Sequence, residues 1–159
     1  MSKERGRLLE QIIETSCRQY AEDGVALIEK TPEPMRVIRR LNDNHTFLCI
    51  FEKKAQPDFK GTLAGGRAVV FEAKYTDHGQ INQDAVTDEQ AKCFERHHAL
   101  GAVCFVLVSF SLDSFCRIPW TAWRDMKQVY GRKYIKCSEA EIVGRVSFTG
   151  SRILFLEGV

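Results

Sequence analysis

The chain has 159 residues, of which 44% are hydrophobic and 28% charged, a composition typical of a globular protein. This length suits one domain with one core and is short for two. No apolar run approaches the roughly 18 residues that a membrane-spanning helix requires. The N-terminal residues MSKERGRLLE lack the features of a signal peptide. We therefore expect a single domain over residues 1–159, located in the cytoplasm and without a membrane partner.

The cysteine pattern argues against a disulfide framework and against a structural zinc site. The six cysteines are scattered, several lie in apolar runs, and no CxxC motif occurs. Cysteines of this kind usually behave as small buried hydrophobic residues in a reducing compartment. The adjacent His97 and His98 have no cysteine at a zinc-site spacing.

The net charge of +2 is too small to indicate nucleic-acid binding, but the basic residues are unevenly distributed. Such clusters can contact phosphates while acidic residues elsewhere cancel the total. A solvated surface explains any single cluster equally well. The candidate DNA-binding residues are Lys3, Arg5, Arg7, Arg36, Arg39, Arg40, Lys53, Lys54 and Lys60.

The first half of the chain predicts a helix followed by extended segments. Apolar residues recur at helical spacing over about residues 3–23, and Gly24 is a natural stop. Residues 25–30 predict a strand that ends at the TPEP turn. Residues 35–40 and 46–54 predict the two arms of a hairpin joined by LNDNH, so residues 35–54 form an insertion in the domain.

The second half predicts further strands and helices. Residues 68–75 and 101–110 read as strands, the second buried on both faces. A polar loop leads to Thr87, whose spacing to Gln90 predicts a capping box and a helix to about residue 100.

The end of the chain predicts shorter elements. A short helix with Trp120 and Trp123, as core or dimer-interface anchors, follows Pro119. A short helix capped at Ser138 and a terminal hairpin complete the chain. The predicted fold class is α/β (α+β), with a central mixed sheet flanked by helices.

Two charged residues share one face of the apolar strand 68–75. Side chains alternate along a strand, so Glu72 and Lys74 lie on the same side as Val70. Asp58 follows Pro57 at the end of its own extended segment, and adjacent strands can bring it beside Glu72. Two carboxylates can hold Mg²⁺, and a lysine can orient the attacking water or stabilise charge during phosphodiester hydrolysis.

A structural interpretation stands beside this one. Glu72 and Lys74 can form an exposed cross-strand pair, and Asp58 can be a turn residue after proline. A bare D…ExK pattern has poor specificity by itself. The Gly65-Gly66 entry to the strand, the following helix and the additional carboxylate of Glu10 favour the functional interpretation.

Several motifs in one order resemble a known family. PD followed by FEAK is similar to the PD-(D/E)xK nuclease superfamily. More narrowly, the chain resembles the RecU-type Holliday junction resolvases. The matching segments are RGRLLEQIIE (5–14) with Tyr20, VALIEKTPEP (25–34), PDFKG (57–61), FEAKYT (71–76), DEQ (88–90) and GAVCFVLVSF (101–110).

The resemblance implies a restriction-endonuclease-like core and a set of site residues. Asp58, Glu72 and Glu10 are then metal ligands, and Lys74 is the catalytic lysine. Gln90 matches a family glutamine near the active centre, although a capping-box role for Thr87 explains it equally well. The resemblance also implies that the hairpin is a stalk inserted at the junction centre.

The sequence thus predicts a homodimeric, structure-selective endonuclease that resolves Holliday junctions in recombination and repair. Its cofactor is Mg²⁺, with Mn²⁺ as a substitute, and its partner is four-way or branched DNA. The dimer follows from the two equivalent strands that a junction presents. Two alternatives stay open: a PD-(D/E)xK nuclease that cuts linear duplex or flaps, and a non-cleaving DNA-binding protein of the same fold.

Overall fold

The computed structural model describes residues 2–52 and 56–159, and a long N-terminal helix opens it. Helix α1 spans Ser2–Glu22, which confirms the predicted helix to within one residue. Its apolar side chains Leu9, Ile13 and Cys17 recur at helical spacing and are buried. The chain leaves the helix through Gly24, whose φ of +68° suits glycine.

A six-stranded mixed sheet forms the centre of the fold, as predicted. Strands β5 and β7 pair in parallel, and every other neighbouring pair is antiparallel. The sheet order is β1-β4-β5-β7-β8-β10. The strands are β1 (Ala26–Lys30), β4 (Phe59–Leu63), β5 (Ala68–Thr76), β7 (Val103–Phe110), β8 (Ser114–Pro119) and β10 (Arg145–Val146).

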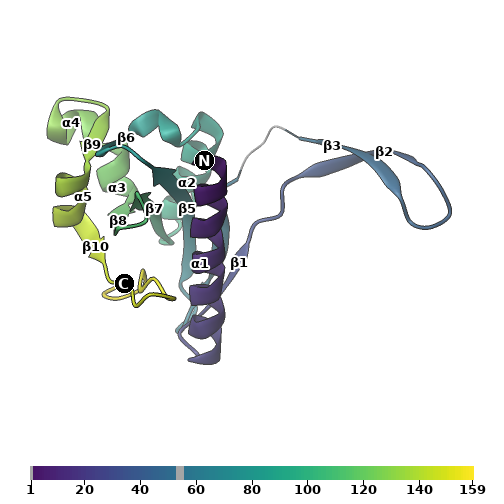
Figure 1. The fold of residues 1–159 in the computed structure, drawn as a ribbon, viewed down its shortest axis with the longest axis horizontal. Helices are drawn as coiled ribbons and strands as arrows, with labels where there is room; N and C mark the ends of the chain where they lie inside the picture. Colours follow the sequence, from purple (N-terminus) through teal and green to yellow (C-terminus); the bar gives the residue numbers. More distant parts are fainter. Residues whose placement is uncertain (1, 53–55) are drawn as a thin grey trace.

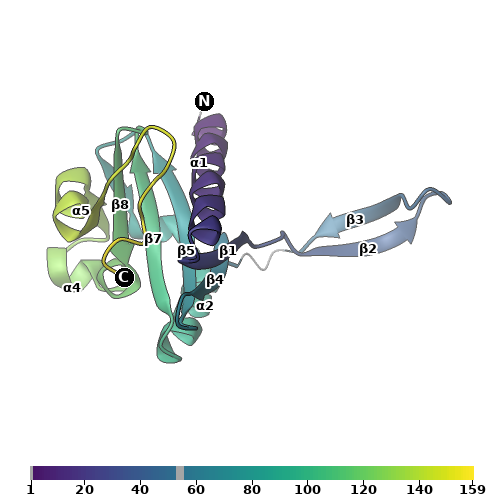
Figure 2. The same cartoon turned by 90° about the horizontal axis from the view of Figure 1, so that it is seen from below.

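The two faces of this sheet carry two separate cores. On one face, α1 and the C-terminal segment cover a stack of Phe59, Phe71 and Phe105, whose ring centroids are 4.9 and 4.7 Å apart. On the other face, the remaining helices cover Val70 and Val106. Figures 1 and 2 show α1 on one side of the sheet and α2 on the opposite side. The alternation predicted for β5 is therefore confirmed, and β7 is buried on both faces.

The helices on the second face pack around two tryptophans. These are α2 (Asp88–Ala99), α3 (Trp120–Arg124), α4 (Met126–Tyr130) and α5 (Cys137–Gly144). Trp120 and Trp123 are 4% and 1% exposed. They are therefore core residues of this chain, and the alternative interpretation as interface anchors loses its basis.

Several short elements differ from the sequence prediction. The loop expected before Thr87 contains β6 (Gln80–Asn82), paired with β9 (Tyr134–Lys136), and the short helix η1 (Gln83–Ala85). Helix α5 begins at Cys137 rather than after a Ser138 cap, because Glu139 accepts a hydrogen bond from the Lys136 N–H at 2.9 Å. The expected terminal hairpin is reduced to one bridge between Phe148 and Ile153. Strand β8 (Ser114–Pro119) was also not predicted from the sequence.

A two-stranded hairpin extends away from the body of the protein (Figures 1 and 2). It consists of β2 (Met35–Arg40) and β3 (Phe47–Phe51), as predicted. The two strands pair only with each other, in a sheet separate from the central one. Their register shifts between Val37 and Arg39, which marks a β-bulge.

Within the described part of the chain, the helices are too short or too polar to cross a membrane.

Candidate active site

The pairing of β4 with β5 brings Asp58 beside Glu72. Phe59 is the register partner of Phe71, so the residue before it lies opposite Glu72. The backbone N–H of Asp58 donates to Glu72 Oε2 at 2.9 Å, and the N–H of Ala73 donates to Asp58 Oδ2 at 3.0 Å. This reciprocal pair of hydrogen bonds fixes the orientation of both carboxylates.

Glu72 is a buried residue with a full set of partners. Its exposure is 2%. Its Oε1 atom accepts from Lys74 Nζ at 2.7 Å and from Gln90 Nε2 at 2.7 Å. Burial rules out the exposed cross-strand pair that the sequence left open. A buried carboxylate needs such compensation, because desolvation opposes its charge.

Gln90 is the capping-box partner of Thr87 and also contacts Glu72, while its role in an active centre stays a prediction. Its Oε1 accepts from the Thr87 N–H at 3.0 Å, and its own N–H donates to Thr87 Oγ1 at 3.2 Å. This is the predicted capping box at the start of α2. Because the Oε1 atom serves the cap, the Nε2 group is directed at Glu72. The capping box therefore orients a side chain of the site.

Glu10 lines one cleft together with Asp58 and Gln90. Its carboxylate, however, is held by another residue. Its Oε2 atom pairs with Lys30 Nζ at 2.5 Å, and Lys30 also lies 3.9 Å from Glu14. Within residues 2–52 and 56–159, no three His, Cys, Asp or Glu side chains gather as a ready metal site. The structure thus brings together Asp58, Glu72, Lys74 and Gln90, while a ligand role for Glu10 stays a prediction.

Lys30 is a residue of the cleft that sequence reasoning missed. It ends β1, and its register partner is Phe59, next to Asp58. Its contact with Glu10 joins residues 20 positions apart. The only sequence signal is a cation at the end of a strand, directly before the TPEP turn.

The pKa of Asp58 is raised from 3.8 to about 7. Burial is the largest cause, and the charge of the neighbouring Glu72 is the second. The Ala73 N–H and Lys74 act in the opposite direction, while Glu10 raises the pKa further. Bound positive charge would relieve this repulsion. Two oxygen-donor carboxylates fit a hard divalent cation, which completes its shell with water and phosphate oxygens.

The base of the hairpin lies at this cleft. Pro34 and Phe51 line it together with Asp58 and Gln90. The Thr31 N–H also donates to the Asp58 carbonyl oxygen at 2.7 Å. The connection from β1 to the hairpin therefore contacts the backbone of a central site residue.

The predicted DNA-binding residues fall into several groups. Lys3, Arg7 and Arg39 are exposed. Arg5 donates to Tyr75 and Asp77, each at 2.9 Å, so it ties α1 to the end of β5. Lys53 and Lys54 lie outside the described residues.

The other three predicted DNA-binding residues each contact a neighbouring residue. Arg36 lies 4.0 Å from Glu52, and Arg40 donates to carbonyl oxygens of the hairpin loop. Lys60 donates to Gln56 Oε1 at 2.5 Å.

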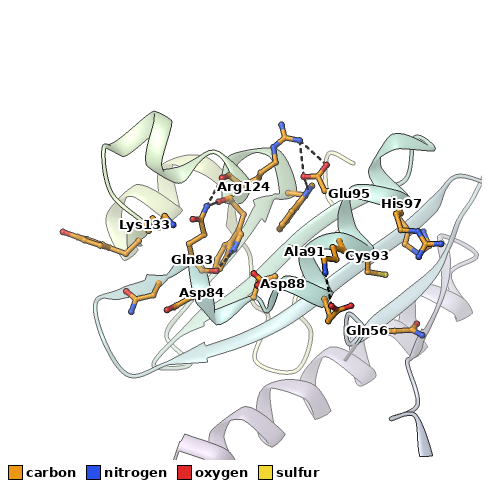
Figure 3. Close-up of a pocket in the computed structure, with 18 of the residues that line it drawn as sticks. Gln56, Gln83, Asp84, Asp88, Ala91, Cys93, Glu95, His97, Arg124 and Lys133 are labelled. Atoms are coloured by element: carbon orange, nitrogen blue, oxygen red, sulfur yellow. Dashed lines mark hydrogen bonds and ion pairs between the residues drawn. The ribbon is translucent and has the colours of Figure 1, made fainter. Parts of the chain in front are cut away.

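A larger cleft lies across α2, between Gln56 and Lys133 (Figure 3). Gln56 lines this cleft and also the smaller one that contains Asp58. The two clefts therefore meet at Gln56.

A mixed sheet that carries a buried Glu beside a half-buried Asp and a lysine is the arrangement of a PD-(D/E)xK nuclease. Residues 4–157 match the family model described as "RecU: Recombination protein U". The chain belongs to the RecU family.

Individual relatives agree with this family. The chain is 28% identical over 149 residues to the Holliday junction resolvase RecU of Geobacillus kaustophilus, covering 86% of this chain and 72% of that protein. It is 27% identical over 145 residues to the RecU resolvase of Bacillus subtilis, covering 86% and 69%.

A solved structure, that of the Holliday junction resolvase Hjc from Archaeoglobus fulgidus, is similar with a TM-score of 0.49 and 10% identity. That match covers 80% of this chain and 88% of Hjc. A likeness of this size carries no argument about function.

Proposed function

We propose that this chain is an endonuclease that resolves Holliday junctions in DNA recombination and repair, with Asp58, Glu72 and Lys74 as its catalytic centre. The observation that carries the site assignment is the placement of the two carboxylates beside Lys74: Glu72 accepts from the Asp58 N–H, and Asp58 accepts from the N–H of Ala73. Membership of the RecU family supports the substrate class. The free thiols of the six cysteines support a cytoplasmic location, because such thiols persist in a reducing compartment.

Asp58 and Glu72 would hold a divalent cation, Mg²⁺ in the first place and Mn²⁺ as a substitute. Mg²⁺ typically binds one or two carboxylates and keeps several waters, so it needs no third acidic ligand. Once Lys30 releases it, Glu10 is positioned to bind one of those waters or the ion. When bound, the cation polarises the scissile phosphate and lowers the pKa of water.

Lys74 and Gln90 orient the reacting groups and stabilise negative charge. The Lys74 side chain is 23% exposed, and its Nζ atom is held by Glu72, which lies on the same strand. There it donates hydrogen bonds to the attacking water and to the phosphate oxygen on which negative charge develops. Gln90 Nε2 keeps Glu72 in one orientation, so the acidic pair is arranged before substrate binds.

We also infer a homodimer, and the hairpin supports it. Paired residues of the two strands share a face, so Met35 with Phe51 and Val37 with Cys49 form one apolar side. Phe47 lies on the same side closer to the tip, and its cross-strand neighbour there is Arg40. Within residues 2–52 and 56–159, no other strand pairs with the hairpin, and all residues of β2 are exposed.

A second copy of the chain is the occupant that fits this face. A four-way junction presents two equivalent scissile strands, and a two-fold dimer presents two equivalent sites. In a symmetric pair each apolar face covers the other, which leaves Arg36 and Arg39 on the opposite faces, next to DNA.

The decisive experiment compares a labelled four-way junction with a linear duplex of the same arms, with Mg²⁺ and with EDTA. We expect Mg²⁺-dependent cutting of the junction. We expect Asp58→Asn to abolish cutting while binding stays near normal, because binding rests on phosphate contacts of basic residues.

The lysine is tested in the same assay. Lys74→Ala should lower the rate by about two decades, and Lys74→Arg should restore little of it, because the guanidinium differs in shape. Wild-type rates in the Asp58 variant would overturn the site assignment. Equal cutting of junction and duplex would favour a general nuclease instead.

A further inference from the structure

Three basic side chains gather beside the catalytic centre without being part of it. Lys60 on β4 is the register partner of Val70 and follows Asp58 by two positions, so the side chains of Lys60 and Asp58 lie on the same face of the sheet. Helix α2 covers this face and carries Arg96 and His97 in its last turn. All three residues line the larger cleft.

The three residues are close enough to influence one another. The pKa of His97 is lowered, first by burial and then by the charges of Lys60 and Arg96. Two elements that are distant in sequence thus place like charges together. Such a cluster repels itself unless an anion or solvent compensates it.

No carboxylate of the described chain neutralises this cluster. Within residues 2–52 and 56–159, no Asp or Glu oxygen lies within 4.0 Å of a charged nitrogen of Lys60, Arg96 or His97. Lys60 donates to the neutral amide of Gln56. Glu29 is its register partner on β1, yet it makes no ion pair with it. By contrast, Lys92, one turn earlier on α2, is paired with Glu89 at 3.1 Å.

The position of the cluster links it to the catalytic cleft. Gln56 lines both clefts and binds Lys60, so Lys60, Arg96 and His97 lie beside the point where the clefts meet. Figure 3 shows Gln56, Cys93 and His97 at one end of the larger cleft, and Gln83, Asp84 and Lys133 at the other. A polyanion bound next to Asp58 that extends along the larger cleft therefore lies beside Lys60 and Arg96.

We propose that Lys60, Arg96 and His97 form a phosphate-binding patch that holds the DNA backbone of one junction arm next to the scissile phosphate. This inference rests on the proposed nuclease function and adds the path of the substrate across α2. The patch binds by charge and hydrogen bonding to phosphates, which fixes the position of the arm without reading its sequence.

The test measures junction binding in the Asp58→Asn background, so that the DNA stays uncut. Each lysine or arginine that contacts a phosphate contributes about one unit to the slope of log K against log salt. We expect the double substitution Lys60→Ala/Arg96→Ala to lower the slope by about two. At about 0.1 M salt it should raise Kd about tenfold or more.

Two matched controls are available on the same surface. His98→Ala changes the neighbour of His97, which points about 100° away on the helix. Lys133→Ala removes a cation from the opposite end of the cleft. Both controls should keep Kd within about twofold of the parent value. His97→Ala should weaken binding more than His98→Ala does.

The possible outcomes separate the two levels of inference. If the wild-type protein neither binds nor cuts a junction with Mg²⁺, the proposed function fails. If the wild-type protein cuts but the double variant keeps the parent slope and Kd, the patch alone is refuted.

A role limited to the charge at the end of α2 predicts a lower melting temperature with an unchanged salt slope, and that result also refutes the patch. If the double variant folds poorly, junction binding by the single variants Arg96→Lys and Arg96→Gln is compared instead. Binding must survive in the first variant and fall in the second.

Discussion

Two neighbouring carboxylates inside a protein repel each other unless positive charge lies beside them. Asp58 and Glu72 are in this situation, and Lys74 with Gln90 compensates Glu72 more completely than Asp58. Asp58 Oδ2 accepts from Ala73, but its other oxygen makes no hydrogen bond to a described residue. The pKa of Asp58 is near 7 because the carboxyl group is largely removed from water and its negative charge is less well compensated than that of Glu72. It leaves Asp58 ready to exchange a proton for a cation.

The raised pKa predicts how stability depends on pH without metal. Between about pH 4 and 7 the folded state holds a proton on Asp58 that the unfolded state has lost. Stability from this group therefore falls as the pH rises through that window. With EDTA, we expect the unfolding free energy of the wild type, relative to Asp58→Asn, to drop by a few kcal/mol between pH 5 and pH 8.

Denaturant unfolding of both proteins at the two pH values measures this difference, and the variant serves as the control for all other titrating groups. Mg²⁺ should restore the wild type at pH 8. Calorimetry near pH 6 should show release of close to one proton on metal binding. A pH-independent difference between the two proteins would contradict the assigned environment of Asp58.

At the scale of elements, the start of α2 couples helix capping to the catalytic centre. Thr87→Ala and Gln90→Ala each remove one half of the capping box, and each should lower stability by about 1 kcal/mol. Only the second variant also removes the hydrogen bond to Glu72. We therefore expect the Gln90 variant to lose about tenfold or more in cleavage rate, while the Thr87 variant stays near the wild-type rate.

Melting curves and single-turnover rates measured in parallel distinguish these effects. Equal losses of rate in the two variants would mean that Gln90 acts only through the cap.

The sequence predicts the features that depend on local spacing, and it does not predict contacts between elements that are distant in the chain. The two-residue alternation of β5 placed Glu72 and Lys74 on one face. The spacing of Thr87 and Gln90 revealed the capping box. The contact of Gln90 with Glu72 and the pair of Lys30 with Glu10 depend on packing between separate elements, so no local pattern encodes them.

The missed strands have a similar explanation. Ile81 is the only apolar residue of β6, so three residues gave no alternation to recognise. Strand β8 contains Arg117 between apolar neighbours and ends at a proline. That arginine is accommodated because it donates to the carbonyl oxygens of Phe155 and Glu157, which the sequence gives no means of foreseeing.

The hairpin is the element expected to set substrate choice. Arg39 and Arg40 end β2, next to the loop of the hairpin, and the hairpin extends away from the sheet (Figures 1 and 2). A junction offers a central opening to such an element, and a duplex does not. Shortening residues 41–45, or changing Arg39 and Arg40 together to Gln, should lower junction cleavage much more than the melting temperature. Binding to linear duplex should fall less, because discrimination rests on shape.

Competition between labelled junction and unlabelled duplex measures this selectivity directly. Lys127→Gln, which removes one exposed cation from α4, serves as the control for loss of surface charge outside the hairpin. A trimmed protein that cuts junctions as well as its parent would refute the stalk role.

At the scale of the whole molecule, the two faces of the hairpin make different predictions for assembly. Phe47 and Leu48 are adjacent and similarly exposed, at 45% and 41%. They point to opposite faces of the ribbon, Phe47 to the apolar one. If two copies pack through that face, Phe47→Glu places a carboxylate in the interface, and the cost of desolvating it, even beside its cross-strand neighbour Arg40, should shift the dimer to a monomer at micromolar concentration. Leu48→Glu should leave the dimer intact.

Sedimentation of both variants and of the wild type, with and without junction DNA, measures the assembly. The monomeric variant should nick one strand of a junction without paired cutting, since a single subunit carries a single site. If Phe47→Glu stays dimeric yet binds junctions poorly, DNA bases rather than a second copy occupy the apolar face. A wild-type protein that sediments only as an 18.2 kDa species, free or on DNA, would exclude paired cutting by a stable dimer.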